Sequence, residues 1–261
     1  MANWQHLNRL ILIVVMTISL SPHIVFGEGY PLRAKYPEVP YIEIDELYEQ
    51  YNNVVIVDVR SDLEFRTVHI SKAIWVSLSK PSFVDEIASV RRKNPGQRMV
   101  VYCNGHSCAK SYKAVKKILT ANIDNVVAFD GGIFDWTNAH PDKTTLLGTN
   151  PAERSKIISN DRFQSVLKNY SYLFEMSLTN DVLVIDVRDK FQIDHTPVFN
   201  ELKQIKLDVL LTKFMLGKYK NKKLIFIDAV GKQVRWLQYY LNEFGYSDYL
   251  FLRGGVASVP Q

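Results

Sequence analysis

The sequence predicts an α/β protein made of two similar halves, each a parallel sheet flanked by helices. Apolar runs at residues 54–57 and 99–102 are typical of strands that are covered on both faces. Segments with helical periodicity, at residues 83–92 and 108–119, alternate with these runs. The same order of segments recurs in the second half of the chain. Strands that alternate with helices favour a parallel sheet with helices on its faces.

The first 27 residues are typical of a signal peptide. Arg9 precedes the apolar stretch 10–20, which is shorter than a membrane-spanning helix requires. Cleavage is expected after Gly27; the alternative is an uncleaved membrane anchor that continues to Phe26. Both alternatives export the rest of the chain, which predicts a periplasmic or secreted protein. Contact with a membrane is expected only if the signal segment stays uncleaved.

The first half, residues 28–143, begins with a proline-rich lead-in and continues as an α/β unit. Its strongest strand ends at Asp58, and its last strand is followed by Gly131 and Gly132. The expected elements are, in order, a strand at 41–44, a helix at 46–51 capped by Asp45, a strand at 54–58, a helix at 83–92, a strand at 99–102, a helix from 108 onwards and a strand at 125–129.

After residues 144–157, which lose periodicity and are interpreted as a linker, the pattern starts again in residues 158–261. The segment 182–188 repeats residues 54–60 almost residue for residue. A strand at 223–227, a helix from Val234 to Phe244 and a strand at 249–252, followed by Gly254 and Gly255, then repeat the remaining segments. The chain is therefore predicted to contain an internal duplication of one unit.

Charge and composition exclude some partners. The chain has 261 residues and a formal net charge of +5, to which the loop lysines 218, 220, 222 and 223 contribute. These lysines are interpreted as a solvated loop. Basic and aromatic residues do not alternate as they do on nucleic-acid-binding surfaces, so no nucleic-acid partner is expected.

Cys103 and Cys108 are the two cysteines of the sequence. A disulfide between them would close a very short loop and contribute little stability, so a chemical role is the better interpretation. Cys103 stands where a strand ends and a helix is about to start, among backbone N–H groups that favour an anion. A stabilised thiolate that small molecules can reach is therefore expected at Cys103.

Several motifs together resemble a rhodanese domain. They are Asp58-x-Arg60-x-x-x-Glu64-Phe65-x-x-x-His69-Ile70, the strand that ends in Cys103, and Gly131-Gly132-x-x-x-Trp136. The resemblance implies two tandem rhodanese-like domains, each with a parallel five-stranded sheet. It also implies an active-site loop made of Cys103, Asn104, Gly105, His106, Ser107 and Cys108. The chemistry of this family is transfer of a sulfane sulfur through a persulfide on the first cysteine of the loop.

The loop residues have different expected roles. Cys103 is the candidate nucleophile, and the remaining loop residues are candidates for substrate binding. Cys108 is either a packed residue at the end of the loop or a resolving thiol. His106 either tunes the thiolate or is an ordinary exposed histidine. Neither a cofactor nor a metal is expected, because three ligands in one tight turn can hardly converge on a tetrahedral ion.

Other motif residues are interpreted as structural. Asp58 and Arg60 are expected to form a hydrogen-bonded pair, since the pair recurs in the half that lacks a thiol, and Trp136 is expected in the core. The absence of an arginine from the loop argues against a cysteine-dependent phosphatase. Asp228 takes the place of Cys103 in the second half, which is therefore expected to be catalytically inactive.

The sequence thus predicts an exported sulfurtransferase that passes sulfur from Cys103 to a thiol or to cyanide. The expected partners are a small sulfur-containing substrate and a thiol acceptor or acceptor protein. Two alternatives stay open: a thiol redox or sulfur-carrier protein that uses Cys103 and Cys108, and a non-catalytic interaction module.

Overall fold

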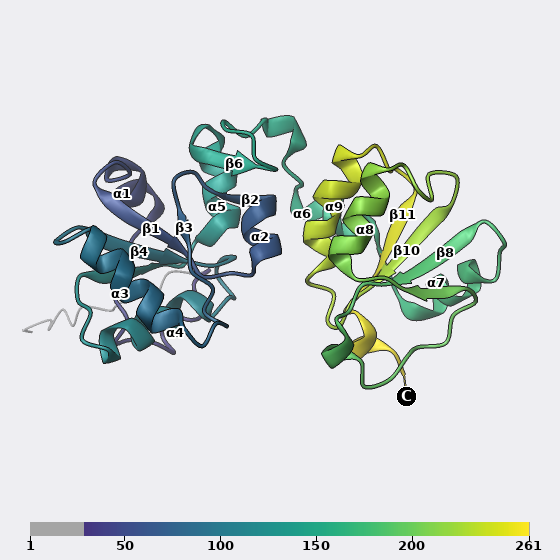
Figure 1. Cartoon of the computed structure of the whole chain (residues 1–261), viewed down its shortest axis with the longest axis horizontal. Helices are drawn as coiled ribbons and strands as arrows, with labels where there is room; N and C mark the ends of the chain where they lie inside the picture. The colour runs from purple at the N-terminus through teal and green to yellow at the C-terminus, as the bar shows by residue number, and fades with distance from the viewer. Residues whose placement is uncertain (1–28, 261) are drawn as a thin grey trace, which may run out of the picture.

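The computed structural model describes residues 29–260 and contains two parallel β-sheets flanked by helices, which confirms the predicted α/β class (Figure 1). The expected signal peptide lies outside the described residues. Within residues 29–260, no helix combines the length and the apolar character that crossing a membrane requires.

The first sheet has four parallel strands in the order β3-β1-β4-β5. These strands are β1 (Val54–Asp58), β3 (Ile74–Trp75), β4 (Arg98–Tyr102) and β5 (Val126–Phe129). The prediction of five strands is wrong for this sheet. The expected strand at 41–44 contributes a single bridge from Tyr41 to Ala128, because the chain already turns into a helix at Ile44.

Helices cover both faces of the first sheet. They are α1 (Ile44–Glu49), α2 (Asp62–Thr67), α3 (Phe83–Lys93), α4 (Lys110–Thr120) and α5 (Gly132–Ala139). Helix α1 starts earlier than expected, with Glu43 at its N-cap and no side-chain cap, so the predicted cap by Asp45 is wrong. Helix α2 begins with a capping box in which Ser61 and Glu64 satisfy each other's backbone N–H groups.

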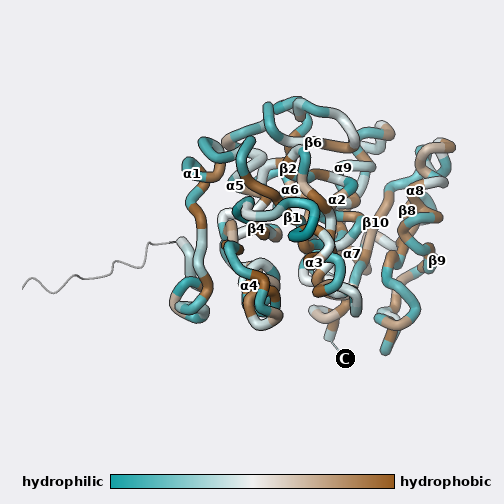
Figure 2. Tube along the Cα trace, turned by 60° about the vertical axis from the view of Figure 1, so that its left-hand side comes forward, coloured by the Kyte–Doolittle hydropathy of each residue, from teal (hydrophilic) through white to brown (hydrophobic). Residues whose placement is uncertain are grey.

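Alternation along β4 determines where the first cysteine points. Val100 and Tyr102 pack on the face that α1 and α5 cover, whereas Met99, Val101 and Cys103 pack with α3 and α4. Figure 2 shows apolar and hydrophilic residues alternating along α4, as expected of a helix with one buried face.

The second sheet has five parallel strands in the order β7-β11-β10-β8-β9. They are β7 (Leu167–Lys168), β8 (Val182–Asp186), β9 (Leu202–Gln204), β10 (Lys223–Ile227) and β11 (Tyr249–Leu252). The helices of this half are α6 (Asn160–Ser165), α7 (Tyr170–Ser177), α8 (Leu207–Met215) and α9 (Val234–Glu243). The repeated segments predicted from the sequence therefore form β8, β10, α9 and β11.

Part of the expected linker belongs to the first half. Strand β6 (Thr144–Leu146) pairs antiparallel with β2 (Val68–Ile70), and a 3₁₀ turn follows at Arg154–Lys156. The sequence predicts no strand here because β6 has only three residues.

The two halves pack directly against each other, with α2 beside α9 (Figure 1). One apolar cluster runs from Ile133 and Trp136 in α5 to Val234 and Leu237 in α9. Across this interface, the rings of Phe134 and Trp236 stack with their centroids 5.6 Å apart. The second half thus rests on the helix that follows β5, close to the cysteine loop.

Candidate functional site

The loop 103–108 starts at the carboxyl end of β4 and is held by the start of α5. The carbonyl of Cys103 accepts a hydrogen bond from the Ile133 N–H at 3.0 Å, and the carbonyl of Asn104 accepts one from the Phe134 N–H at 3.3 Å. Within the loop, the Cys108 N–H donates to the Gly105 carbonyl at 2.8 Å. The backbone of the loop is therefore fixed at both ends.

Gly132 allows this close contact between α5 and the loop. Its φ is +63°, and a Cβ atom at this position would lie 2.5 Å from the Gly105 nitrogen and 2.6 Å from the Cys103 carbonyl oxygen. Both the positive φ and the lack of space require glycine.

We expect Gly132→Ala to disrupt the loop, because the loop backbone must move to make room for a methyl group. The free energy of unfolding should fall by about 1–3 kcal/mol. The reactivity of the loop thiols should fall by a larger fraction than the stability does. Chemical denaturation and a thiol-reactivity assay measure the two effects. Gly148→Ala is the matched control, since φ is also positive there but no atom lies within 4 Å of the added Cβ. Equal losses in both variants would show that backbone strain alone is responsible.

Cys103 is fully buried, which corrects the expectation of a sulfur within reach of small molecules. Its Sγ donates to the Cys108 carbonyl at 3.0 Å and lies 3.5 Å from Ser111 Oγ. Burial raises the pKa of the Cys103 thiol well above its usual value, so the prediction of a stabilised thiolate on this residue is also wrong for the closed loop. The backbone carbonyl of Cys108 accepts the thiol hydrogen, and the hydrogen bonds from the backbone and side chain of Ser111, which lower the pKa, do not offset the effect of burial.

Cys108 carries the more acidic thiol of the pair. Its side chain is partly exposed and both cysteines are free. A hydrogen bond from the Cys103 side chain and further ones from the Asn104 and Lys110 backbones lower the pKa of Cys108 to about 6. The lowered pKa of Cys108 and the raised pKa of Cys103 favour the thiolate on the partly exposed Cys108.

Asn104 is held between two charged residues from the first half. Its Nδ2 donates to Glu64 Oε1 at 2.7 Å, and its Oδ1 accepts from Arg60 Nη1 at 3.3 Å. Burial would raise the pKa of Glu64, but the charges of Arg60 and Lys110 lower it overall. Lys110 Nζ lies 4.0 Å from Glu64, at the limit of an ion pair. Asn104 thus connects the loop to helix α2.

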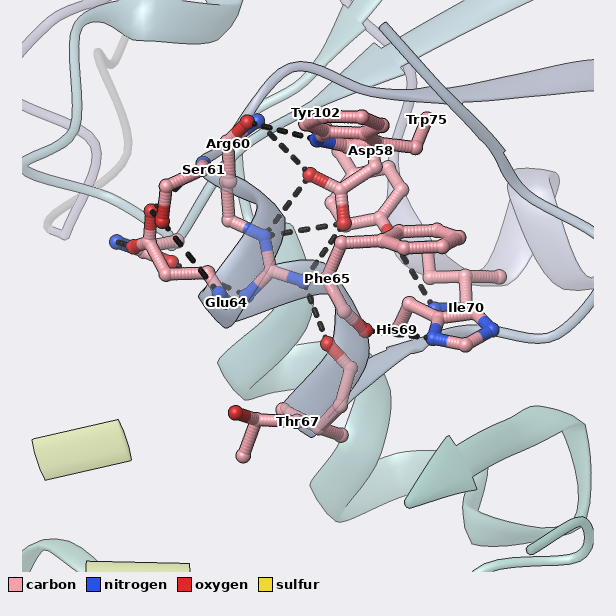
Figure 3. A network of polar contacts seen from close by, with 12 residues as sticks. Asp58, Arg60, Ser61, Glu64, Phe65, Thr67, His69, Ile70, Trp75 and Tyr102 are labelled. Atoms are coloured by element: carbon pink, nitrogen blue, oxygen red, sulfur yellow. Dashed lines mark hydrogen bonds and ion pairs between the residues drawn. The ribbon is translucent and has the colours of Figure 1, made fainter. Parts of the chain in front are cut away.

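Asp58 and Arg60 form the buried pair expected from the sequence (Figure 3). Arg60 Nε and Nη2 donate to the Asp58 carboxylate, at 2.9 Å and 2.6 Å for the shortest contacts, and Nη2 also donates to the Val68 carbonyl. Arg188 makes the same contacts with Asp186 in the second half. Arg60 therefore serves as structural support and also reaches a loop residue.

His106 forms an ordered contact and is not simply a solvent-exposed histidine. Its Nε2 lies 2.6 Å from Asp135 Oδ2, its Nδ1 lies 2.7 Å from the Gly29 carbonyl, and its ring stacks on Tyr30 with centroids 4.2 Å apart. Burial would lower the pKa of His106, but the hydrogen bond and the charge of Asp135 raise it overall. The lead-in segment is thereby attached to the loop through one titratable ring.

We expect this contact to weaken as pH rises. Because the folded-state pKa of His106 is raised above its unfolded value, its stabilisation is complete below about pH 6.5. It is lost as the pH rises through the folded-state pKa. The side chains are about one third exposed, so the effect should stay below about 1 kcal/mol. Thermal unfolding of wild type and His106→Gln between pH 5 and pH 9 measures it. The difference in unfolding temperature between wild type and His106→Gln should shrink with rising pH. A difference that stays constant would contradict the role of a protonated His106 in this contact.

In the second half, Asp228 starts a loop whose backbone is held in the same way as that of the loop 103–108. The carbonyls of Asp228 and Ala229 accept from the N–H groups of Val256 and Ala257, at 2.8 Å and 3.0 Å. A Cβ on Gly255 would lie 2.5 Å from the Asp228 carbonyl, as on Gly132 in the first half. The Asp228 carboxylate accepts hydrogen bonds from the backbone N–H groups of its own loop, those of Gly231, Gln233 and Val234.

The structure places the predicted site residues together, with some differences in role. Ser107 is exposed, and Trp136 is buried in the core as expected. Sequence reasoning missed Asp135 as the partner of His106 and Glu64 as the partner of Asn104. The Ser61-x-x-Glu64 capping pattern could have located Glu64, but Asp135 has no local signal.

Among residues 29–260, no group of three or more His, Cys, Asp or Glu side chains is arranged to hold a metal ion.

Residues 43–139 match the family model described as the rhodanese-like domain. An uncharacterized protein from Synechocystis sp. is 30% identical over 92 residues, which cover 34% of this chain and 46% of that protein. Among solved structures, the thiosulfate sulfurtransferase from Pseudomonas aeruginosa is similar at 19% identity with a TM-score of 0.38. The match covers 89% of this chain and 46% of that protein.

The rhodanese-like domain of an Anabaena sp. protein is similar at 22% identity with a TM-score of 0.36, covering 42% of this chain and 80% of that one. The chain spans less than half the length of the Synechocystis and Pseudomonas proteins that it matches.

Proposed function

We propose that the rhodanese-like domain at residues 43–139 makes this protein a sulfurtransferase, with a persulfide on Cys103 as the intermediate. The observation that carries the proposal is the position of Cys103 as the first residue of a loop that starts at the end of a central strand. The backbone of Cys103 and Asn104 is fixed by α5. We further propose that the protein acts after export from the cytoplasm.

The closed loop defines what must happen before sulfur transfer. The Cys103 thiol is covered by the backbone and side chain of Cys108, so a donor reaches it only after this end of the loop moves aside. Movement breaks the hydrogen bond to the Cys108 carbonyl and exposes the sulfur to water, which removes the burial that raises its pKa.

In the transfer itself, the Cys103 thiolate attacks the outer sulfur of a sulfane donor. A new S–S bond forms on Cys103 while the donor's S–S bond breaks, and the electron pair of that bond leaves with the rest of the donor, as sulfite in the case of thiosulfate. A thiol or cyanide then attacks the outer sulfur and releases Cys103 as a thiolate. The loop N–H groups are available to stabilise the persulfide anion once the loop is open.

We propose that the second half contributes no sulfur chemistry. A carboxylate cannot carry a sulfane sulfur, and the Asp228 carboxylate already accepts the loop N–H groups that an anion would need. The second half is then a support that covers the α5 side of the active domain.

A second candidate function is dithiol–disulfide exchange. The contact between Cys103 and Cys108 and the low pKa of the exposed Cys108 favour it, because a low-pKa accessible thiolate is typical of redox-active cysteines. Here Cys108 would attack a disulfide first and Cys103 would resolve the mixed disulfide.

Intact-protein and peptide mass spectrometry separates the two candidates. After exposure to thiosulfate or to a persulfide donor, and without reductant, the sulfurtransferase proposal expects a gain of one sulfur atom on the peptide that contains Cys103. Dithiol exchange is tested in a separate sample with a small-molecule disulfide as the oxidant, which is reduced to two thiols; it expects a loss of two hydrogen atoms from the protein, with Cys103 and Cys108 joined. If neither change occurs, both proposals are wrong and an interaction module remains.

A further inference from the structure

A cavity of about 220 Å³ lies between the two halves of the protein, outside the cysteine loop. Its walls come from Val68, from helix α5, from residues 157–160 and from helix α9. None of the residues 103–108 lines it. At about 30 Å³ per molecule of liquid water, its volume corresponds to roughly seven waters. The cavity therefore has room for a small ligand but not for a nucleotide or a peptide.

Arg235, a partly buried side chain on the wall, contributes a positive charge to this cavity. Its guanidinium carbon lies 3.9 Å from the centroid of the Phe134 ring and 5.3 Å from that of Phe163, so aromatic faces hold the group in position. Within residues 29–260, no carboxylate is close enough to pair with Arg235, and no hydrogen-bond acceptor is assigned to its N–H groups. Burial lowers the pKa of this side chain, which is the expected effect when no anion compensates it.

Thr137 adds a second unsatisfied group. Its side chain is 4% exposed and lines the cavity, yet its Oγ1 has no hydrogen-bond partner among the described residues. The hydroxyl of Tyr239, also on the wall, accepts a hydrogen bond from the Ile158 N–H at 3.2 Å and keeps its own hydrogen to donate. Three different side chains thus present free donors around one small space.

We propose that this cavity binds a small oxyanion, with Arg235 as its charged ligand and Thr137 and Tyr239 as hydrogen-bond donors. A guanidinium group with free N–H groups suits the paired oxygens of a carboxylate or of a sulfur oxyanion. The apolar side chains of Ile133 and Ile157 also line the cavity, so the part of the ligand that is not the oxyanion group should be small or apolar.

Such a ligand would connect the two halves. Arg235 belongs to α9 of the second half, whereas Thr137 belongs to α5 of the first. Ile133 and Phe134, whose N–H groups hold the cysteine loop, also line the cavity. Occupancy would therefore stabilise the packing of the halves and the support of the loop.

Isothermal titration calorimetry tests this proposal on the full chain carrying Cys103→Ser, which prevents sulfur chemistry from contributing heat. Sodium sulfate, sodium thiosulfate and sodium acetate are titrated separately at constant ionic strength, with sodium chloride as the ionic control. At least one of the three anions should give a saturable isotherm. Preference for acetate identifies a carboxylate site, and preference for sulfate or thiosulfate identifies a sulfur oxyanion site.

The variants then locate the site. Arg235→Leu should weaken the binding at least tenfold, and the isosteric Thr137→Val should weaken it several-fold. Arg92→Leu, on the exposed side of α3, should bind like the parent protein. If Arg235→Leu fails to fold, as judged by circular dichroism, Arg235→Lys replaces it, since it keeps the charge but loses the paired N–H groups. The proposal is overturned if none of the three anions gives a saturable isotherm. It is also overturned if the Arg235 and Thr137 variants bind the anion as tightly as the parent protein does.

Discussion

Replacement of Cys103 by serine should abolish sulfur transfer, with a loss on the order of a thousandfold or more in rate. The hydroxyl of serine cannot hold a sulfane sulfur, and Cys103 is the residue whose backbone the fold fixes at the end of β4. Cys108→Ser should lower the rate less than about tenfold, below the roughly hundredfold loss typical when a required general base is removed. Formation of thiocyanate from thiosulfate and cyanide, or transfer to a small thiol, measures both rates.

The two variants form a matched pair, because both place the same hydroxyl in the same loop. Circular dichroism and thermal unfolding serve as the control for folding. Equal losses in both variants would favour the dithiol function over sulfur transfer. Full activity of Cys103→Ser would eliminate the persulfide at this residue.

Arg60→Leu should cost about 3–5 kcal/mol in the free energy of unfolding, because it leaves the buried Asp58 carboxylate without a counter-charge. Both side chains are fully buried, so water cannot replace the lost contacts. Arg60 also donates to the Val68 carbonyl and to Asn104 of the loop. We therefore expect lower activity as well as lower stability. Urea denaturation measures the first effect, and activity measured well below the unfolding transition measures the second.

Arg188→Leu is the internal control for this prediction. It removes the equivalent arginine beside Asp186, so the stability loss should be similar. Arg188 does not reach the cysteine loop, and the activity of the folded protein should stay unchanged. The double variant Asp58→Asn/Arg60→Met should recover part of the lost stability, since no unpaired charge remains buried. A loss below about 1 kcal/mol for Arg60→Leu would show that the pair is not a main support of the first half.

The sequence alone was sufficient to predict two parallel sheets flanked by helices and most of their strands. Runs such as 54–57 and 182–185 are apolar at every position, and a strand with both faces covered is the structure that buries all of them. The Asp58–Arg60 pair was also predictable, because its repetition as Asp186 and Arg188 separates structural support from thiol chemistry. The position of Cys103 at a strand end followed from the same pattern.

Short elements were not predictable in this way. Strand β6 depends on pairing with β2 from another part of the chain, and its three residues carry little periodicity. The segment 41–44 was predicted as a strand but makes only a single bridge at Tyr41. The start of α1 at Ile44 was missed for a related reason, since no side chain caps it.

Only the tertiary structure decided the state of the two thiols. Local sequence places Cys103 beside backbone N–H groups, but burial raises the pKa of Cys103, whereas hydrogen bonds lower the pKa of the partly exposed Cys108. Likewise, the contacts of His106 with Asp135 and of Arg235 with Phe134 join residues that are far apart in the chain. The sequence determined the strands through the side chains that must be buried, whereas pKa values and pockets depend on which distant groups the fold brings together.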